Sequence, residues 1–160
     1  MKAASVKELK SAIENLPPAE LLELCLRLIK SKKENKELAT YILFDETNEA
    51  GYIENVKSSL VLLFDDVNKT NPFFAKKTLR KIVRVANRYI RYSKDATTEV
   101  EVLLFVADSM RCLKLDMKKS TALENIYIGL IKKIKKGVES LHDDLQYDYQ
   151  KQIKLLDTGL

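Results

Sequence analysis

The sequence has few residues that interrupt helices and few that carry catalytic or metal-binding chemistry. Its 160 residues include only four glycines, three prolines, two cysteines and one histidine, and no tryptophan. Glycine and proline end strands and form tight turns, so their scarcity predicts an all-α protein, as does a composition that is 46% hydrophobic and 32% charged. Cys25 and Cys112 lack metal-ligand spacing, so we expect both to be small buried side chains without a metal or redox role.

Long apolar runs are also absent. The longest, residues 102–107, is far shorter than the roughly 18 residues that a membrane-spanning helix requires. The start of the chain contains Lys, Glu and Asn where a signal peptide has a continuous apolar stretch. We therefore expect a soluble, cytoplasmic protein with no membrane insertion, and the length predicts a single domain over residues 1–160.

Helical spacing and capping residues predict seven or eight helices. Ser5 and Glu8 have the spacing of a capping box before a helix at 6–15, and Asn71 with Pro72 begins a helix that extends to about residue 94. Further helices are expected at 18–32, at 34–44, from 49, from 95 or 97, and from 121, the last as one helix or two. The second and sixth helices are apolar on most sides, so we expect them to be the most buried. The expected core residues are Leu24, Leu28, Leu63, Ile82, Val83, Leu104 and Ile134.

Two segments of the chain are similar at an offset of 62 residues, where SKKENKEL at 31–38 aligns with SKDATTEV at 93–100. At the same offset, three apolar residues align with three others: Leu21, Leu24 and Leu28 with Val83, Ala86 and Ile90. In this spacing the chain resembles the HEAT and armadillo families of α-helical repeat proteins. The resemblance implies antiparallel hairpins stacked into a superhelix with an extended binding surface. An irregular up-and-down helical bundle would produce much of the same pattern, so both arrangements stay open.

Two short segments place paired acidic residues after an apolar run: ILFDETN at 42–48 and LLFDDVN at 62–68. A calcium loop beginning at Asp45 would need Gly at its sixth position and Glu at its twelfth, but these are Ala50 and Val56. A di-metal bundle site would need a second partner for the single Glu-x-x-His spacing, Glu139 to His142. We therefore predict no catalytic residue, metal site or cofactor. The acidic pairs Asp45, Glu46, Asp65 and Asp66 are interpreted as helix ends.

Positive charge is concentrated in one predicted helix. No acidic residue lies between Asp66 and Asp95, whereas this segment holds nine of the 28 basic residues. At about 100° per residue, the basic side chains of residues 76–94 occupy an arc of about 140°, opposite an apolar arc of about 120°. The candidate binding residues on this basic face are Lys76, Lys77, Arg80, Lys81, Arg84, Arg88 and Arg91.

Basic residues one helical turn apart repel one another unless negative charge lies opposite them. That charge could come from the chain's own acidic segments, an acidic protein partner, nucleic-acid phosphates or an anionic membrane surface. The leading hypothesis is a non-enzymatic interaction module that docks an acidic protein, and the alternative is a nucleic-acid-binding protein that uses the same face. A second cluster, IKKIKK at 131–136, would extend the face only if the two helices adjoin.

Overall fold

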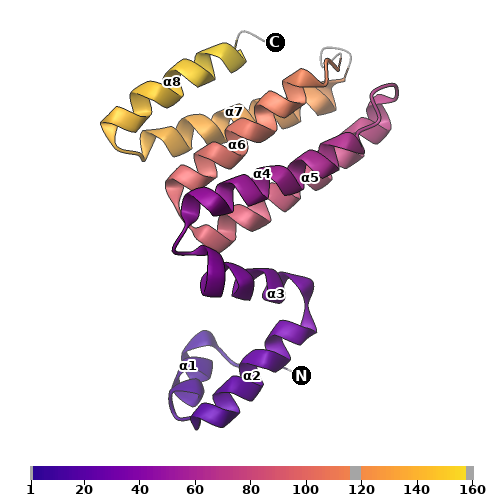
Figure 1. The fold of residues 1–160 in the computed structure, drawn as a ribbon. Coiled ribbons are helices and arrows are strands. Elements are labelled where there is room, and N and C mark those ends of the chain that lie inside the picture. Colours follow the sequence, from indigo (N-terminus) through magenta and orange to yellow (C-terminus); the bar gives the residue numbers. More distant parts are fainter. Residues whose placement is uncertain (1, 116–119, 158–160) are drawn as a thin grey trace. The chain divides into compact units, whose positions relative to one another are not determined.

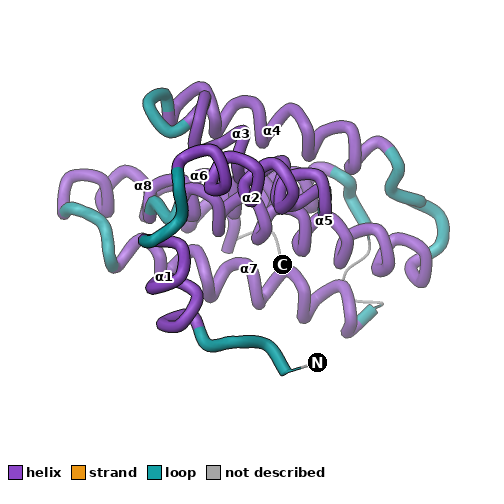
Figure 2. Tube along the Cα trace, turned by 90° about the horizontal axis from the view of Figure 1, so that it is seen from below, coloured by secondary structure: helices purple, strands orange, loops and turns teal. Residues whose placement is uncertain are grey.

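The computed structural model describes residues 2–115 and 120–157, and this part of the chain is helical with no strand (Figure 2). The all-α prediction is confirmed, with eight α-helices and one π-helical turn in the described residues. None of the described helices is long and apolar enough to cross a lipid bilayer. By the contacts between its residues the chain divides into two compact units, and the boundary in the sequence lies between Phe44 and Asp45.

The N-terminal unit contains α1 (Val6–Glu14), α2 (Pro18–Ser31) and α3 (Lys33–Thr40), followed by the π-helical turn Tyr41–Asp45. The predicted capping box is present, because the Ser5 side chain accepts a bond from the Glu8 backbone and the Glu8 carboxylate accepts one from the Ser5 backbone. The Asn35 side chain donates to the Leu28 carbonyl oxygen at 2.8 Å. This bond ties the start of α3 to the end of α2.

The prediction that α2 is a buried helix is wrong. None of its residues is buried; Leu28 is 52% exposed, Leu24 is half-buried and Cys25 is exposed. The physical reason is the shortness of its neighbours, since α1 has nine residues and α3 has eight. Two such helices do not supply enough surface to cover a helix that is apolar on most sides.

The C-terminal unit contains five helices, and consecutive helices run antiparallel (Figure 1). Of these, α6 packs against each of the other four, so it forms the centre of the unit, as predicted for the sixth helix. The superhelical stacking implied by the HEAT and armadillo resemblance stays a prediction. The helices are α4 (Glu49–Asp65), α5 (Pro72–Ser93), α6 (Ala96–Cys112), α7 (Thr121–Glu139) and α8 (Asp143–Asp157).

The core of this unit lies around α6. Of the expected core residues, Ile82, Leu104 and Ile134 are buried, whereas Leu63 and Val83 are only half-buried. Both half-buried residues lie at the border between the buried and exposed faces of their helices. Cys112, at the end of α6, is exposed, which contradicts its predicted burial.

Helix α7 ends at Glu139 and residues 140–142 connect it to the next helix, so the C-terminal segment forms two helices. Gly137 does not break the helix; it lies inside α7, where an added Cβ would come within 2.9 Å of the Val100 side chain of α6. The absence of a side chain at Gly137 therefore permits the close approach of α7 to α6.

Candidate interaction surface

The acidic pairs lie at helix ends, as the sequence indicated. Asp45 is the last residue of the π-helical turn, and the side chain of Asn48, three residues later, caps α4. Asp65 ends α4 and Asp66 is its C-cap, after which Asn68 accepts hydrogen bonds from the backbone of residues 70 and 71. The described residues contain no group of three His, Cys, Asp or Glu side chains placed to hold a metal ion.

Helix α5 separates an apolar face from a basic face, and it begins as predicted. The Asn71 side chain caps it and Pro72 occupies its first turn. One face is buried against the rest of the unit through Ala75, Leu79, Ile82, Ala86 and Ile90. The opposite face carries the candidate binding residues, so burial of the apolar side holds the basic side toward solvent.

Five candidate binding residues are exposed: Lys77, Arg80, Lys81, Arg84 and Arg91. None of these five forms an ion pair with any described residue. Neutralisation by the chain's own acidic segments, one of the explanations considered above, is therefore not what the structure shows for them. Their mutual repulsion is left for a partner or for salt to compensate.

Lys76 and Arg88 differ from the other candidates because both are half-buried. The Lys76 ammonium lies 5.1 Å from the centre of the Phe73 ring, and the Arg88 guanidinium lies 5.4 Å from that of Tyr89. Cations at such distances are attracted to the ring faces. These two residues are therefore partly engaged within α5 and contribute less free charge to its surface.

Helix α7 adjoins α5, which brings the second basic cluster next to the first. The Lys133 ammonium of α7 donates to the Asn87 side chain of α5 at 2.9 Å. Lys132, Lys133 and Lys136 are exposed and share an arc of about 100° on α7, whereas Lys135 falls outside it. We call these three lysines, together with the five exposed residues of α5, the cationic surface.

Between the two helices lies an apolar groove of about 270 Å³, which we call the α5/α7 groove. Val83, Ile126 and Leu130 supply its apolar lining, and Gly129 forms part of its α7 side. Arg80 and Lys133 line it from opposite helices. Sequence reasoning missed this groove, because residues more than 40 positions apart in the chain form it. Arg80 had been considered only as a candidate binding residue and Val83 only as a core residue.

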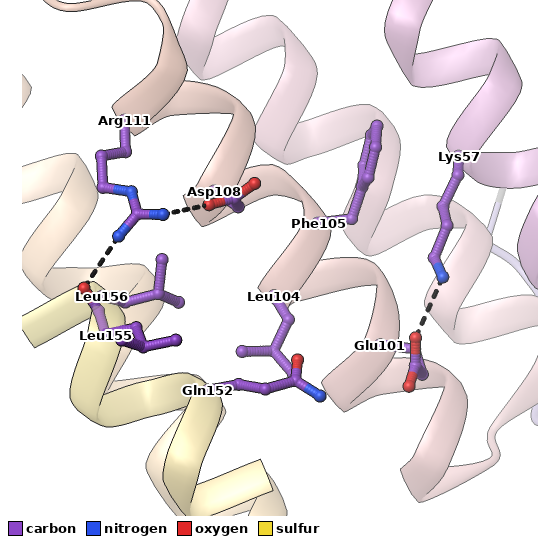
Figure 3. A pocket seen from close by; sticks show the side chains of 9 residues that line it. All are labelled: Lys57, Glu101, Leu104, Phe105, Asp108, Arg111, Gln152, Leu155 and Leu156. Carbon is purple, nitrogen blue, oxygen red and sulfur yellow. Dashed lines mark hydrogen bonds and ion pairs between the residues drawn. The ribbon is translucent and has the colours of Figure 1, made fainter.

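A second hollow, of about 280 Å³, lies between α4, α6 and α8 (Figure 3). Its apolar lining includes Leu104, Phe105 and Leu156, but the charges around it are paired. Lys57 lies 3.0 Å from Glu101 and Arg111 lies 2.8 Å from Asp108. Since its cations and anions neutralise each other, this hollow shows no preference for a partner of either charge.

No protein-family model matches the chain, and neither curated protein sequences nor solved structures match it at a significant level.

Proposed function

We propose that this protein is a non-enzymatic interaction module that acts in the cytoplasm and docks an acidic protein through its cationic surface. The observation that carries the proposal is the set of exposed α5 cations, Lys77, Arg80, Lys81, Arg84 and Arg91, none of which pairs with a described acidic side chain. The three exposed lysines of α7 enlarge the same field.

Docking of an acidic segment would remove an unfavourable interaction as well as create a favourable one. Arg80 and Arg84 are one helical turn apart, and like charges at this spacing cost a few tenths of a kcal/mol. The negative charges of an acidic partner offset several of these repulsions at once, and the electric field of the cationic surface attracts such a partner. Both effects weaken as salt screens the charges.

The α5/α7 groove favours a protein partner. Its apolar lining consists of the aliphatic residues Val83, Ile126 and Leu130, which suit an aliphatic side chain. Proteins that bind single-stranded nucleic acid use aromatic side chains on which the bases stack. Phe73 supports the nucleic-acid alternative, because it is 63% exposed and lies beside Lys76 at the start of α5.

Charge reversal at positions outside the groove tests the proposal. We would compare the wild type, the double variant Lys81→Glu with Arg84→Glu, and a control with the same change in net charge, Lys7→Glu with Lys154→Glu. Each of the three proteins would be immobilised and exposed to an extract of the source cells, and the extract proteins that it retains would be identified. An acidic segment of every retained protein would then be synthesised for binding measurements. We expect to find an acidic segment that binds the wild type and the control but does not bind the double variant.

Oligonucleotides serve as the competing probe at about 0.15 M salt. If they bind the wild type, and the dependence of affinity on salt falls by about one phosphate contact for each cation removed, the nucleic-acid alternative is correct. Equal retention of every partner by the wild type and the double variant would contradict both functions.

A further inference from the structure

We infer that the α5/α7 groove is an anchor pocket, and that the docked segment is an acidic amphipathic helix that inserts an aliphatic side chain into it. The inference rests on the proposed function, because it specifies which kind of acidic segment the cationic surface receives.

The lining of the groove is suited to an aliphatic group. Leu130 is buried, and Val83 and Ile126 are half-buried, so part of their apolar surface remains accessible from the groove. Its volume of about 270 Å³ lies just below the roughly 300–1,000 Å³ typical of sites for drug-sized ligands. The groove therefore has room for one aliphatic side chain.

Gly129 keeps the groove open. An added Cβ at this position would have no atom within 4 Å, and the backbone has no positive φ that would require glycine. A side chain added here would therefore begin in open space, and a long one would project toward the space that the anchor is expected to occupy. Glycine in the middle of a helix costs about 0.5–1 kcal/mol relative to alanine, so its presence here favours the open groove over helix stability.

The charges at the groove select an acidic neighbour for the anchor. Among the described residues, exposed Arg80 has no ion-pair partner, and Lys133 donates only to the neutral side chain of Asn87. The Asn87 side chain is itself held in place, because its amide nitrogen donates to the Val83 carbonyl oxygen at 2.6 Å. An aliphatic anchor with Asp or Glu close to it would fill the apolar groove and place a carboxylate near both cations.

A helix is the conformation that best matches this geometry. Arg80 and Arg84 repeat at one turn of α5, and Lys132 and Lys136 repeat at one turn of α7. An amphipathic helix lying along the groove presents acidic residues at the same i and i+4 spacing, with its anchors on the face between them.

The test uses displayed peptides of about 20 residues, long enough for several helical turns, with Glu at the i and i+4 spacing and the other positions randomised. Selection would use the full chain, and the selected peptides would then be measured on variants of Gly129. Gly129→Leu and Gly129→Met fill the groove, whereas Gly129→Ala is the matched control that leaves most of it open. Thermal unfolding would verify that each variant is folded.

Support consists of selected peptides that share an aliphatic residue in a constant position relative to their acidic residues. Their affinity should fall about tenfold or more on Gly129→Leu and Gly129→Met, the factor expected for expulsion of a buried aliphatic group. On Gly129→Ala it should change by less than about threefold, because a methyl group occupies little of the groove.

Two other results would overturn the inference and are distinguishable. In the first, the peptides bind the groove-filling variants as tightly as the wild type but lose affinity for the double variant Lys81→Glu with Arg84→Glu. This result would contradict the anchor pocket and leave the proposed function intact. Failure to enrich any peptide on the wild type relative to that charge-reversed variant would overturn the acidic-partner function as well.

Discussion

The hydroxyl group of Tyr149 donates a hydrogen bond to one carboxylate oxygen of Glu101 at 2.8 Å, joining α8 to α6. The other oxygen of the same carboxylate lies 3.0 Å from the Lys57 ammonium of α4 (Figure 3). Glu101 therefore links three helices of the C-terminal unit through one half-buried carboxylate.

This network predicts a loss of stability in alkaline solution. Burial, and next the bond to the Glu101 carboxylate, raise the pKa of Tyr149 well above its ordinary value of 10.0. Burial lowers the pKa of Lys57, but the bonds to Glu101 and Glu54 outweigh it and raise that pKa overall. Both groups hold their protons more tightly in the folded state, so their stabilisation is present below about pH 10 and is lost above it.

Urea unfolding of the wild type and of Tyr149→Phe across this range measures the effect. We expect the variant to lose about 1.5–3 kcal/mol at neutral pH, since a hydrogen bond to a charged carboxylate is removed. Above pH 10 its free energy of unfolding should decline less steeply than that of the wild type. Equal slopes above pH 10 would show that Tyr149 does not contribute to the pH dependence.

Truncation of Ile82 and Leu28 should have very different consequences. Ile82 is 0% exposed in α5, so Ile82→Ala should lower the free energy of unfolding by about 2–5 kcal/mol. Leu28 is 52% exposed in α2, and Leu28→Ala should change stability by no more than about 0.5 kcal/mol. Chemical denaturation of both variants provides the comparison, and similar losses would mean that α2 is covered in solution.

The two glycines of α7 should respond oppositely to alanine. At Gly129 the added methyl group meets nothing within 4 Å, so Gly129→Ala should stabilise the protein by about 0.5–1 kcal/mol. At Gly137 the methyl group would lie 2.9 Å from the β-branched side chain of Val100, which is 0% exposed. Overpacking of this kind costs about 1–3 kcal/mol, which exceeds the gain in helix propensity. Thermal unfolding should therefore show opposite shifts, and a stabilised Gly137→Ala would contradict the close contact with Val100.

Removal of the cap of α6 should destabilise the central helix. The Asp95 side chain accepts a hydrogen bond at 2.9 Å from the backbone nitrogen of Thr98, a residue that is 0% exposed. Asp95→Ala should cost about 0.5–2 kcal/mol, while Asp95→Asn retains the acceptor and should cost less. If the two substitutions cost the same, the cap is not the source of the loss.

Local features of the fold were predicted from the sequence because they depend on neighbouring residues. The capping box of Ser5 and Glu8 and the cap at Asn71 both concern atoms within one helical turn, whereas the sequence left the start of α6 open between Asp95 and Thr97 and the structure places the cap at Asp95. The buried and basic faces of α5 were likewise predictable, since the 3.6-residue period places side chains around a helix regardless of what it packs against.

Burial in α2 was not predictable by the same reasoning. The apolar residues of this helix indicate that it needs cover on most sides, but periodicity does not show whether the chain supplies that cover. Leu28 and Cys25 are exposed because the neighbouring helices are short. The exposure of Cys112 likewise depends on its place at the end of α6, where packing ends.

The sequence by itself determined the helices, most of their caps and the segregation of charge on α5, since each follows from interactions between residues three or four positions apart. Only the tertiary structure decided that α7 lies beside α5, that Lys133 reaches Asn87 and that an apolar groove opens at Gly129. It also decided that Lys77, Arg80, Lys81, Arg84 and Arg91 do not pair with the described acidic residues. The reason is that helix periodicity sets which way a side chain points, whereas its neighbours are set by how whole helices pack against one another.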